Sequence, residues 1–307
     1  MKDESITFVW INKGTYLSCG IFLIRQLIRK HSMRYYLHFS LIFLAIWFAN
    51  SLFGQETSAF VPKGNKGRFF IYWGWNQESY SKSDIHFKGQ SYDFSLHNVI
   101  ADDKESPFSA RIYFNPSNIT IPQYNFRIGY FFKENWSASL GMDHMKYVVR
   151  QGQTVKINGQ ISNTNTEYNG SYSDQDIVIK KGFLRLEHTD GLNYANVDIR
   201  RQSTLTTFSK ISVLYLGGIG VGALIPRTDA TLLGYDRNDE FHLAGYGFNA
   251  LLGVQIKWAN HFFVQSEYKF GYINMGDIRT TSSINDKADQ SFTYHQINIL
   301  FGSYFGF

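Results

Sequence analysis

The residues of this sequence that could do chemistry are few, and the best candidate is one histidine. In Glu187-His188-Thr189-Asp190, His188 has a carboxylate on either side, and a histidine with acidic neighbours can serve as a general base. His188 is therefore the candidate catalytic residue. The alternative is structural: a residue at the aqueous rim, or one ordered by hydrogen bonds beside a bulge.

A second candidate set consists of charged residues that alternate with apolar residues along the chain. Seven of them fall on the polar side of this alternation: Arg127, Asp143, Asp198, Arg200, Lys257, Glu267 and Lys269. A charge removed from water is tolerated when it is paired, and this set contains both signs. The pattern predicts a buried charge network that fills the interior of a barrel, with a narrow pore as the alternative.

A glycine-rich run, Gly217-Gly218-Ile219-Gly220-Val221-Gly222, superficially resembles a phosphate-binding loop. That chemistry needs a strand-to-helix turn whose amides face the phosphate. Three of these glycines are instead spaced by two, which is the period of a strand. We expect them to leave room for bulky neighbours, and we predict no nucleotide site.

Composition excludes several classes of protein. Hydrophobic residues make up 44% of the 307, yet mean hydropathy is −0.24, so apolar and polar residues are interleaved. This favours a β-barrel over a bundle of membrane helices. A net charge of +5 without a Lys/Arg cluster predicts no nucleic-acid partner. The single Cys19, together with histidines that lack metal-ligand spacing, predicts no disulfide, metal or cofactor.

The first 67 residues do not show this alternation. Residues 33–55 have a positive start, an apolar core of about ten residues and a polar exit, which predicts a secretory signal peptide cleaved near Gln55. A retained anchor is the alternative. Residues 1–32 are then an N-terminal extension or precede the true start at Met33, and residues 56–67 are a linker. Cleavage at Gln55 resembles that of Bacteroidetes signal peptides.

From residue 68 onward, segments of period two predict strands. Three short connections at 133–135, 201–208 and 259–261 alternate with four longer ones at 80–121, 151–181, 226–242 and 277–289. Such an arrangement gives about eight strands with both ends on one side, an all-β transmembrane antiparallel barrel over 68–307. Alternations at 84–88 and 92–96 predict a hairpin within the first long outer loop. The apolar parity reverses near Asp190-Gly191, which predicts a β-bulge.

The last segment, Gln290 to Phe307, alternates apolar and polar residues and ends in phenylalanine. A closing strand of this kind resembles the assembly signal of outer-membrane β-barrel proteins, and the whole chain resembles small outer-membrane barrels of Bacteroidetes that have no assigned activity. The resemblance implies export to the outer membrane. It also implies contact with outer-membrane lipid and lipopolysaccharide, and recognition of Phe307 by the barrel-assembly machinery.

His188 shares parity with Leu184 and Leu186, so we expect it to face lipid. A lipid-facing histidine resembles that of the lipid A deacylases, which are also eight-stranded barrels. That family carries a nucleophilic serine two positions after the histidine, where this chain has Asp190. The sequence therefore favours a structural or surface-interaction protein that makes its contacts through the loops at 80–121 and 151–181. A lipid acyl hydrolase using His188 is the alternative, and a narrow pore is the second.

Overall fold

The structure is a computed structural model that describes residues 64–107, 109, 111, 115 and 122–306. The predicted signal peptide, its cleavage site and the terminal Phe307 lie outside these residues. Among the residues described, no helix is long and apolar enough to cross a membrane.

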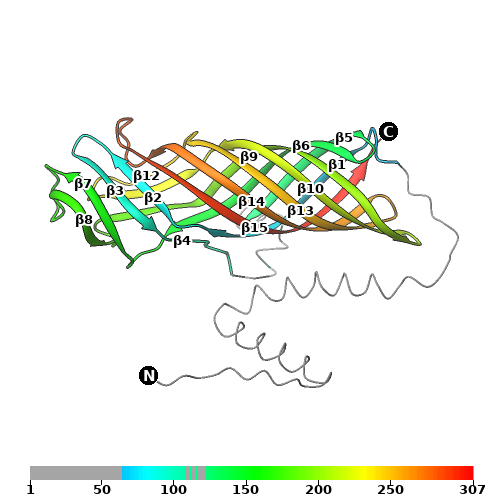
Figure 1. The fold of residues 1–307 in the computed structure, drawn as a ribbon, viewed down its shortest axis with the longest axis horizontal. Helices are drawn as coiled ribbons and strands as arrows, with labels where there is room; N and C mark the ends of the chain where they lie inside the picture. Colours follow the sequence, from blue (N-terminus) through cyan, green and yellow to red (C-terminus); the bar gives the residue numbers. More distant parts are fainter. Residues whose placement is uncertain (1–63, 108, 110, 112–114, 116–121, 307) are drawn as a thin grey trace, which may run out of the picture. The chain divides into compact units, whose positions relative to one another are not determined.

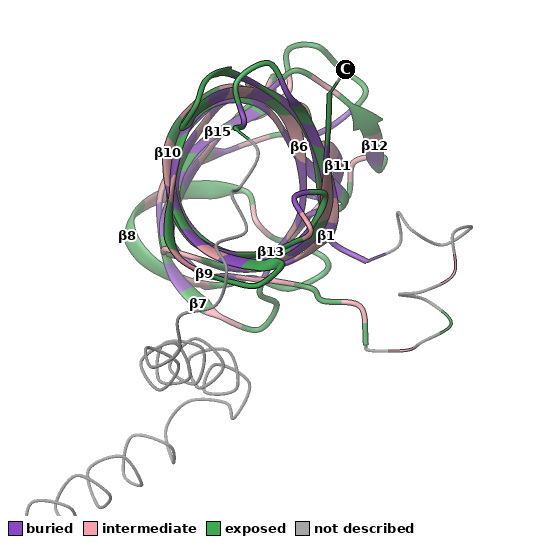
Figure 2. Ribbon diagram, turned by 90° about the vertical axis from the view of Figure 1, so that its right-hand side faces the viewer, coloured by how far each residue is buried: buried purple, intermediate pink, exposed green. Residues whose placement is uncertain are grey.

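Eight long antiparallel strands form a closed ring (Figures 1 and 2). They are β1 (Phe69–Tyr80), β5 (Tyr124–Lys133), β6 (Trp136–Val149), β9 (Leu184–Phe208), β10 (Ile211–Leu224), β13 (Gly245–Trp258), β14 (Phe262–Arg279) and β15 (Lys287–Phe305). Each strand pairs with the next in this order, and β15 pairs with β1. The predicted eight-stranded barrel is confirmed.

The strand register determines the width of the ring. A line of paired residues that leaves β1 at Phe69 passes once through every strand and returns to β1 at Ser79, ten residues further on. An eight-stranded barrel with a stagger of this size has strongly tilted strands and an interior just wide enough for side chains.

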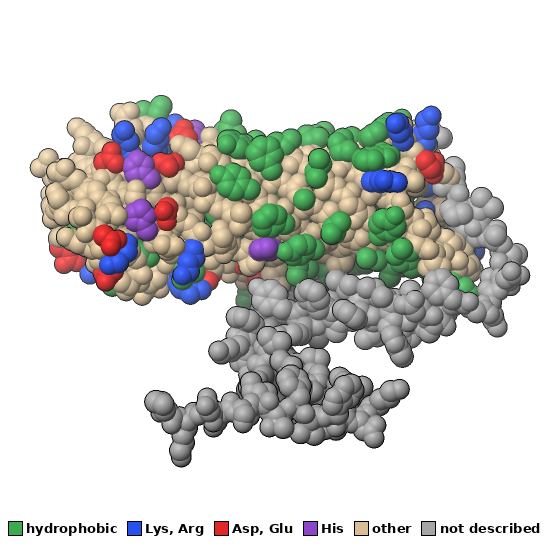
Figure 3. All heavy atoms as spheres, viewed as in Figure 1, with side chains coloured by type: hydrophobic (Ala, Val, Ile, Leu, Met, Phe, Trp, Pro, Cys, Tyr) green, Lys and Arg blue, Asp and Glu red, His purple; other side chains and the backbone are tan. Residues whose placement is uncertain are grey.

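An apolar band covers the outer wall of the ring. Leu140, Ile219 and Leu252 are 61%, 68% and 69% exposed, and hydrophobic side chains dominate the middle of the face in Figure 3. Aromatic residues lie toward both ends of this band: Trp136, Trp258 and Phe262 at one end, and Tyr246, Phe248 and Tyr272 at the other. Apolar exposure on this scale with aromatic girdles is typical of a wall in contact with lipid.

The long connections extend the sheet beyond this band. They contain β2 (Ser83–Lys88), β3 (Tyr92–Val99), β4 (Ala101–Asp102), β7 (Thr154–Ile161), β8 (Gly170–Val178), β11 (Arg227–Leu232) and β12 (Asn238–Phe241). The order β15-β2-β3-β7-β8 continues from one side of the ring, and β9-β11-β12 from another. The predicted hairpin is confirmed as β2–β3. The segment 151–181, which we expected to be a polar loop, instead contains β7 and β8, whose polar side chains are largely exposed.

Two different interiors follow one another along the barrel axis. Inside the lipid-facing part a polar and charged network fills the middle of the bore, and a small apolar cluster that includes Phe70, Phe263 and Tyr304 lies at the end away from the extension. The extension encloses a large apolar core that includes Phe87, Phe94, Leu186 and Phe292. Lipid surrounds the first part and water the second, so the apolar side chains face outward in one and inward in the other.

A bulge in β9 marks this change. The pairing of β9 with β6 shifts between Met145 and Tyr147, and Gly191 has a φ of +127°. The predicted bulge near Asp190-Gly191 is confirmed, but it does not exchange the two faces. The register shifts by two residues, so even-numbered residues of β9 remain buried inside the barrel on both sides of it.

One predicted turn is wrong. Residues 201–208, interpreted as a polar connection, continue β9 to Phe208 and pair with β10, with a register shift between Val213 and Leu214, and the turn is at Ser209 and Lys210. Serine and threonine suit an exposed strand as well as a turn, so composition alone did not distinguish the two.

Candidate functional site

Six of the seven candidate charges form one connected network across the bore. Lys269 donates to Asp143, and Arg127 Nη2 lies 3.6 Å from Asp143 Oδ1. Arg127 Nη1 and Arg200 Nη2 each lie 2.8 Å from Asp198 Oδ2, and Arg200 also pairs with Glu267. All six side chains are at most 6% exposed, and three positive charges balance three negative ones.

Lys257 is apart from this network. It is only 2% exposed, but its Nζ is 5.8 Å from the centre of the Tyr304 ring, and no carboxylate within the described residues is an ion-pair partner. The structure thus separates one predicted member from the other six.

Amide side chains complete the network, and sequence reasoning missed them. Asn196 accepts from Arg127 at 2.5 Å, and Asn125 donates to Asp143 at 2.9 Å. Asn249 donates to Asp198 at 3.3 Å. The signal was available, since these residues alternate with apolar ones in the same way as the charges. Amides supply both donors and acceptors, and can therefore bridge charges of either sign.

The strand-spaced glycines make room for these side chains. A Cβ at Gly220 would lie 1.9 Å from Asp198 Oδ1, and one at Gly218 would lie 3.0 Å from Arg200 Cγ. This is the role predicted for the run, and it leaves no loop that could hold a phosphate.

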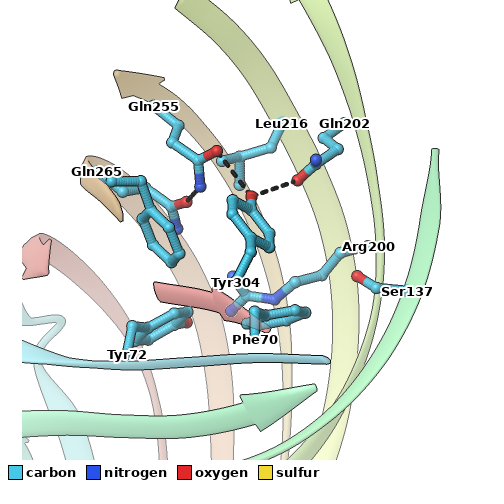
Figure 4. A pocket seen from close by; sticks show the side chains of 10 residues that line it. Phe70, Tyr72, Ser137, Arg200, Gln202, Leu216, Gln255, Gln265 and Tyr304 are labelled. Atoms are coloured by element: carbon cyan, nitrogen blue, oxygen red, sulfur yellow. Dashed lines mark hydrogen bonds between the residues drawn. The ribbon is translucent and has the colours of Figure 1, made fainter. Parts of the chain in front are cut away.

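A chain of hydrogen bonds joins Gln202, Tyr304, Gln255 and Gln265 inside the bore (Figure 4). The Tyr304 hydroxyl lies 2.7 Å from Gln255 Oε1 and 3.2 Å from Gln202 Oε1, and Gln255 donates to Gln265 at 2.6 Å. The cavity among these residues and Arg200 measures about 20 Å³. A space of this size holds about one water molecule.

His188 does not face lipid, so that prediction is wrong. It is fully buried in the apolar core of the extension, where its Nδ1 lies 3.2 Å from Thr228 Oγ1 and its ring lies 5.7 Å from that of Tyr147. It shares a face with Leu184 and Leu186 as predicted, but even-numbered residues of β9 point inward along the whole strand, and in the extension this inner face is apolar. Burial lowers the pKa of His188 to about 4, so its ring is neutral at pH 7.

The acidic neighbours of His188 belong to a different cluster. Glu187 pairs with Arg185 and with Lys104, whose Nζ is 3.4 Å away, and Asp190 lies 2.9 Å from Arg227. Glu187 points away from His188 because adjacent strand residues point to opposite faces. Asp190 has the same parity as His188 but lies beside the bulge, and its side chain is 60% exposed. The four-residue motif is therefore not assembled as one catalytic unit.

The structure also brings together residues that the sequence did not single out. Gln123 donates to both Glu78 and Asp103 where the polar bore meets the apolar core. Burial raises the pKa of Asp103 to about 7.

On the outer surface, His86 lies 2.8 Å from both Asp93 and Asp289. Across the described residues, no group of three or more histidine, cysteine or acidic side chains could hold a metal ion.

These features define a class of protein, an eight-stranded transmembrane β-barrel with a water-exposed sheet extension. No protein-family model matches the sequence, and neither does any curated protein. Solved structures with a similar arrangement are outer-membrane proteins. OprG from Pseudomonas aeruginosa has 12% identity and a TM-score of 0.36, covering 80% of this chain and 100% of that one. AlkL has 11% identity and a TM-score of 0.37, covering 83% and 97%. NspA, a Neisserial surface protein, has 10% identity and a TM-score of 0.27, covering 76% and 99%.

Proposed function

We propose that this chain is an outer-membrane β-barrel with a structural or surface-interaction role, and that its bore is closed by its own side chains. The observation that carries the proposal is the pair of successive interiors, a charge-balanced polar network followed by a packed apolar core. A solute would have to displace buried ion pairs and then a packed core, so a pore is the weaker hypothesis.

The sheet extension is the part of the molecule suited to contacts outside the membrane. Its outer surface is charged and polar, with His86 between Asp93 and Asp289, and His97 beside Asp84 at 2.9 Å. Charged side chains gather over this end in Figure 3. Because the strands are held by a packed core, the surface is pre-organised, which lowers the entropic cost of binding a partner.

We also infer the finer features that the sequence predicted. These are a signal peptide cleaved near Gln55, a Bacteroidetes-type barrel, assembly through the strand that ends at Phe307, and contact with outer-membrane lipid and lipopolysaccharide. Alternation of apolar and polar residues through β15 up to Phe305 supports the assembly role.

The lipid acyl hydrolase alternative has one contact in its favour, the 3.2 Å approach of Thr228 Oγ1 to His188 Nδ1. Both residues are at most 1% exposed and lie among apolar side chains. A nucleophile and base must reach the substrate carbonyl, so this arrangement favours a packing role for His188.

Cysteine labelling tests the proposed location and orientation. The chain's one native cysteine, Cys19, lies within residues 1–32, which precede the predicted signal peptide. We expect a membrane-impermeant maleimide to label Ser171→Cys, on exposed β8, in intact cells. Ser209→Cys, at the exposed β9–β10 turn, is the matched control and should react only after lysis. Labelling of Ser209→Cys but not Ser171→Cys in intact cells would refute the orientation, and failure of both would refute the surface role.

A further inference from the structure

A single arginine interrupts the apolar outer wall of the barrel. Arg201 is exposed on β9, and its guanidinium carbon lies 5.7 Å from the centre of the Trp136 ring. Within the described part of the chain, no carboxylate is its ion-pair partner. A cation on a lipid-facing wall is unfavourable unless it reaches the interface or a counter-charge.

The register locates Arg201 near one edge of the lipid band. Its backbone pairs with Trp136, the first residue after the β5–β6 turn, and with Gly217 of β10. Tryptophan prefers the level of the lipid headgroups. The sheet extension lies at the opposite end, so in the proposed orientation Arg201 belongs to the periplasmic leaflet.

Two adjoining hollows run from Arg201 along the outer wall. Their volumes are about 590 and 570 Å³, and they share Ile199, Ile219, Ala250 and Phe270. Gly217 and Ala250 have small side chains and leave space on the outer wall, and the larger side chains of Tyr268 and Leu252 also line this space. The five contributing strands β6, β9, β10, β13 and β14 are consecutive neighbours in the ring (Figure 1). The result is an apolar groove that has a cation at one end.

We propose that this groove is a binding site for one glycerophospholipid, with its phosphate on the Arg201 guanidinium and one acyl chain along Ile219 and Ala250. Guanidinium groups bind phosphate oxygens through two parallel hydrogen bonds, and the Trp136 ring beside Arg201 restricts where its guanidinium lies. Lipopolysaccharide is less suitable, because its phosphates would lie at the other end of the groove in the proposed orientation. The assignment to the periplasmic leaflet rests on the proposed function, whereas the binding site itself does not.

The test measures lipid retention by native mass spectrometry. The detergent-folded barrel is titrated with palmitoyl-oleoyl phosphatidylglycerol, and the population carrying one lipid is followed. We expect Arg201→Gln to weaken retention of that lipid by about tenfold or more, the cost of losing a charge-assisted hydrogen-bonded pair. Ala250→Leu, which fills the groove from an exposed position, should weaken it as well.

Two control variants preserve the site. Lys210→Gln removes an exposed cation outside the groove, at the β9–β10 turn, and Val264→Leu enlarges a lipid-facing residue outside the groove; both should retain lipid like the parent chain. Equal retention by parent and Arg201→Gln, or a loss in Lys210→Gln as large as in Arg201→Gln, would overturn the proposal. A loss in Ala250→Leu alone would also overturn it, since the groove would then hold an alkyl chain without recognising phosphate. None of these outcomes depends on orientation, so a failure here is distinguishable from a failure of cysteine labelling.

Discussion

Replacing Asp198 with asparagine tests whether the bore is stabilised by its charge balance. Asp198 Oδ2 lies 2.8 Å from Arg127 Nη1, 2.8 Å from Arg200 Nη2 and 3.1 Å from Arg200 Nε, and the residue is 0% exposed. Asparagine keeps the shape but removes the charge, which leaves three positive and two negative groups in the network. Two guanidinium groups then share an enclosed space with too few counter-charges.

The expected loss is large. Removing one partner of a buried ion pair costs about 3–5 kcal/mol, because the remaining charge is buried and uncompensated. Amide contacts from Asn196 and Asn249 satisfy hydrogen bonds but carry no charge, so we expect a loss within that range. At about 1.4 kcal/mol for each factor of ten, the folding equilibrium constant should fall by two to four powers of ten.

Urea unfolding in phospholipid vesicles measures this loss, with tryptophan fluorescence and the gel mobility of unboiled samples as two independent readouts. Asp174→Asn is the matched control: the same substitution at a side chain that is 74% exposed and 4.0 Å from Lys156, where solvent screens the pair and no measurable change is expected. A loss below about 1 kcal/mol for Asp198→Asn would refute the reasoning, since the bore would then be hydrated enough to tolerate an unbalanced charge.

Two further predictions concern the apolar core and the closed bore. Because burial lowers the pKa of His188 from 6.5 to about 4, the unfolded chain binds this proton more tightly, and stability should fall as pH drops from about 6.5 to about 4. Between pH 7 and pH 5 this contribution is about 2 kcal/mol; urea titrations of His188→Gln should lack it, and parallel curves for the two proteins would contradict the buried neutral state. In planar bilayers the folded chain should carry no stepwise current, whereas discrete openings in the parent chain would support the narrow-pore alternative.

The sequence by itself determined the barrel. Alternation through 124–132, 246–258 and 290–305 predicted the strands, and the difference between short and long connections gave their number and the side on which they end. A bulge beside Gly191 was predicted and is present, but the reversal of apolar parity on which the prediction rested comes from the change of surroundings from lipid to water, because the bulge leaves the two faces of β9 unchanged. The strands and their number depend on local period and on connection length, which a linear sequence contains.

Only the tertiary structure decided which solvent each face meets. Period two divides Leu184, Leu186 and His188 from their neighbours, but it does not say whether their side is lipid or a packed interior. That side is the interior along the whole of β9, and in the extension it belongs to an apolar core, because β11 pairs with β9 while β2, β3 and β7 enclose the same core. Residues far apart in sequence close this core, so no local pattern could reveal it.

The same distinction applies to the charges. The sequence selected seven charged residues for the bore, but their pairing depends on the ten-residue stagger of the ring. That stagger brings Lys269 of β14 to Asp143 of β6, and leaves Lys257 near Tyr304, apart from the other six. It also puts Arg201 beside Trp136 at the end of an apolar groove. Polarity can be read along one strand, whereas partners are determined by how eight tilted strands close on one another.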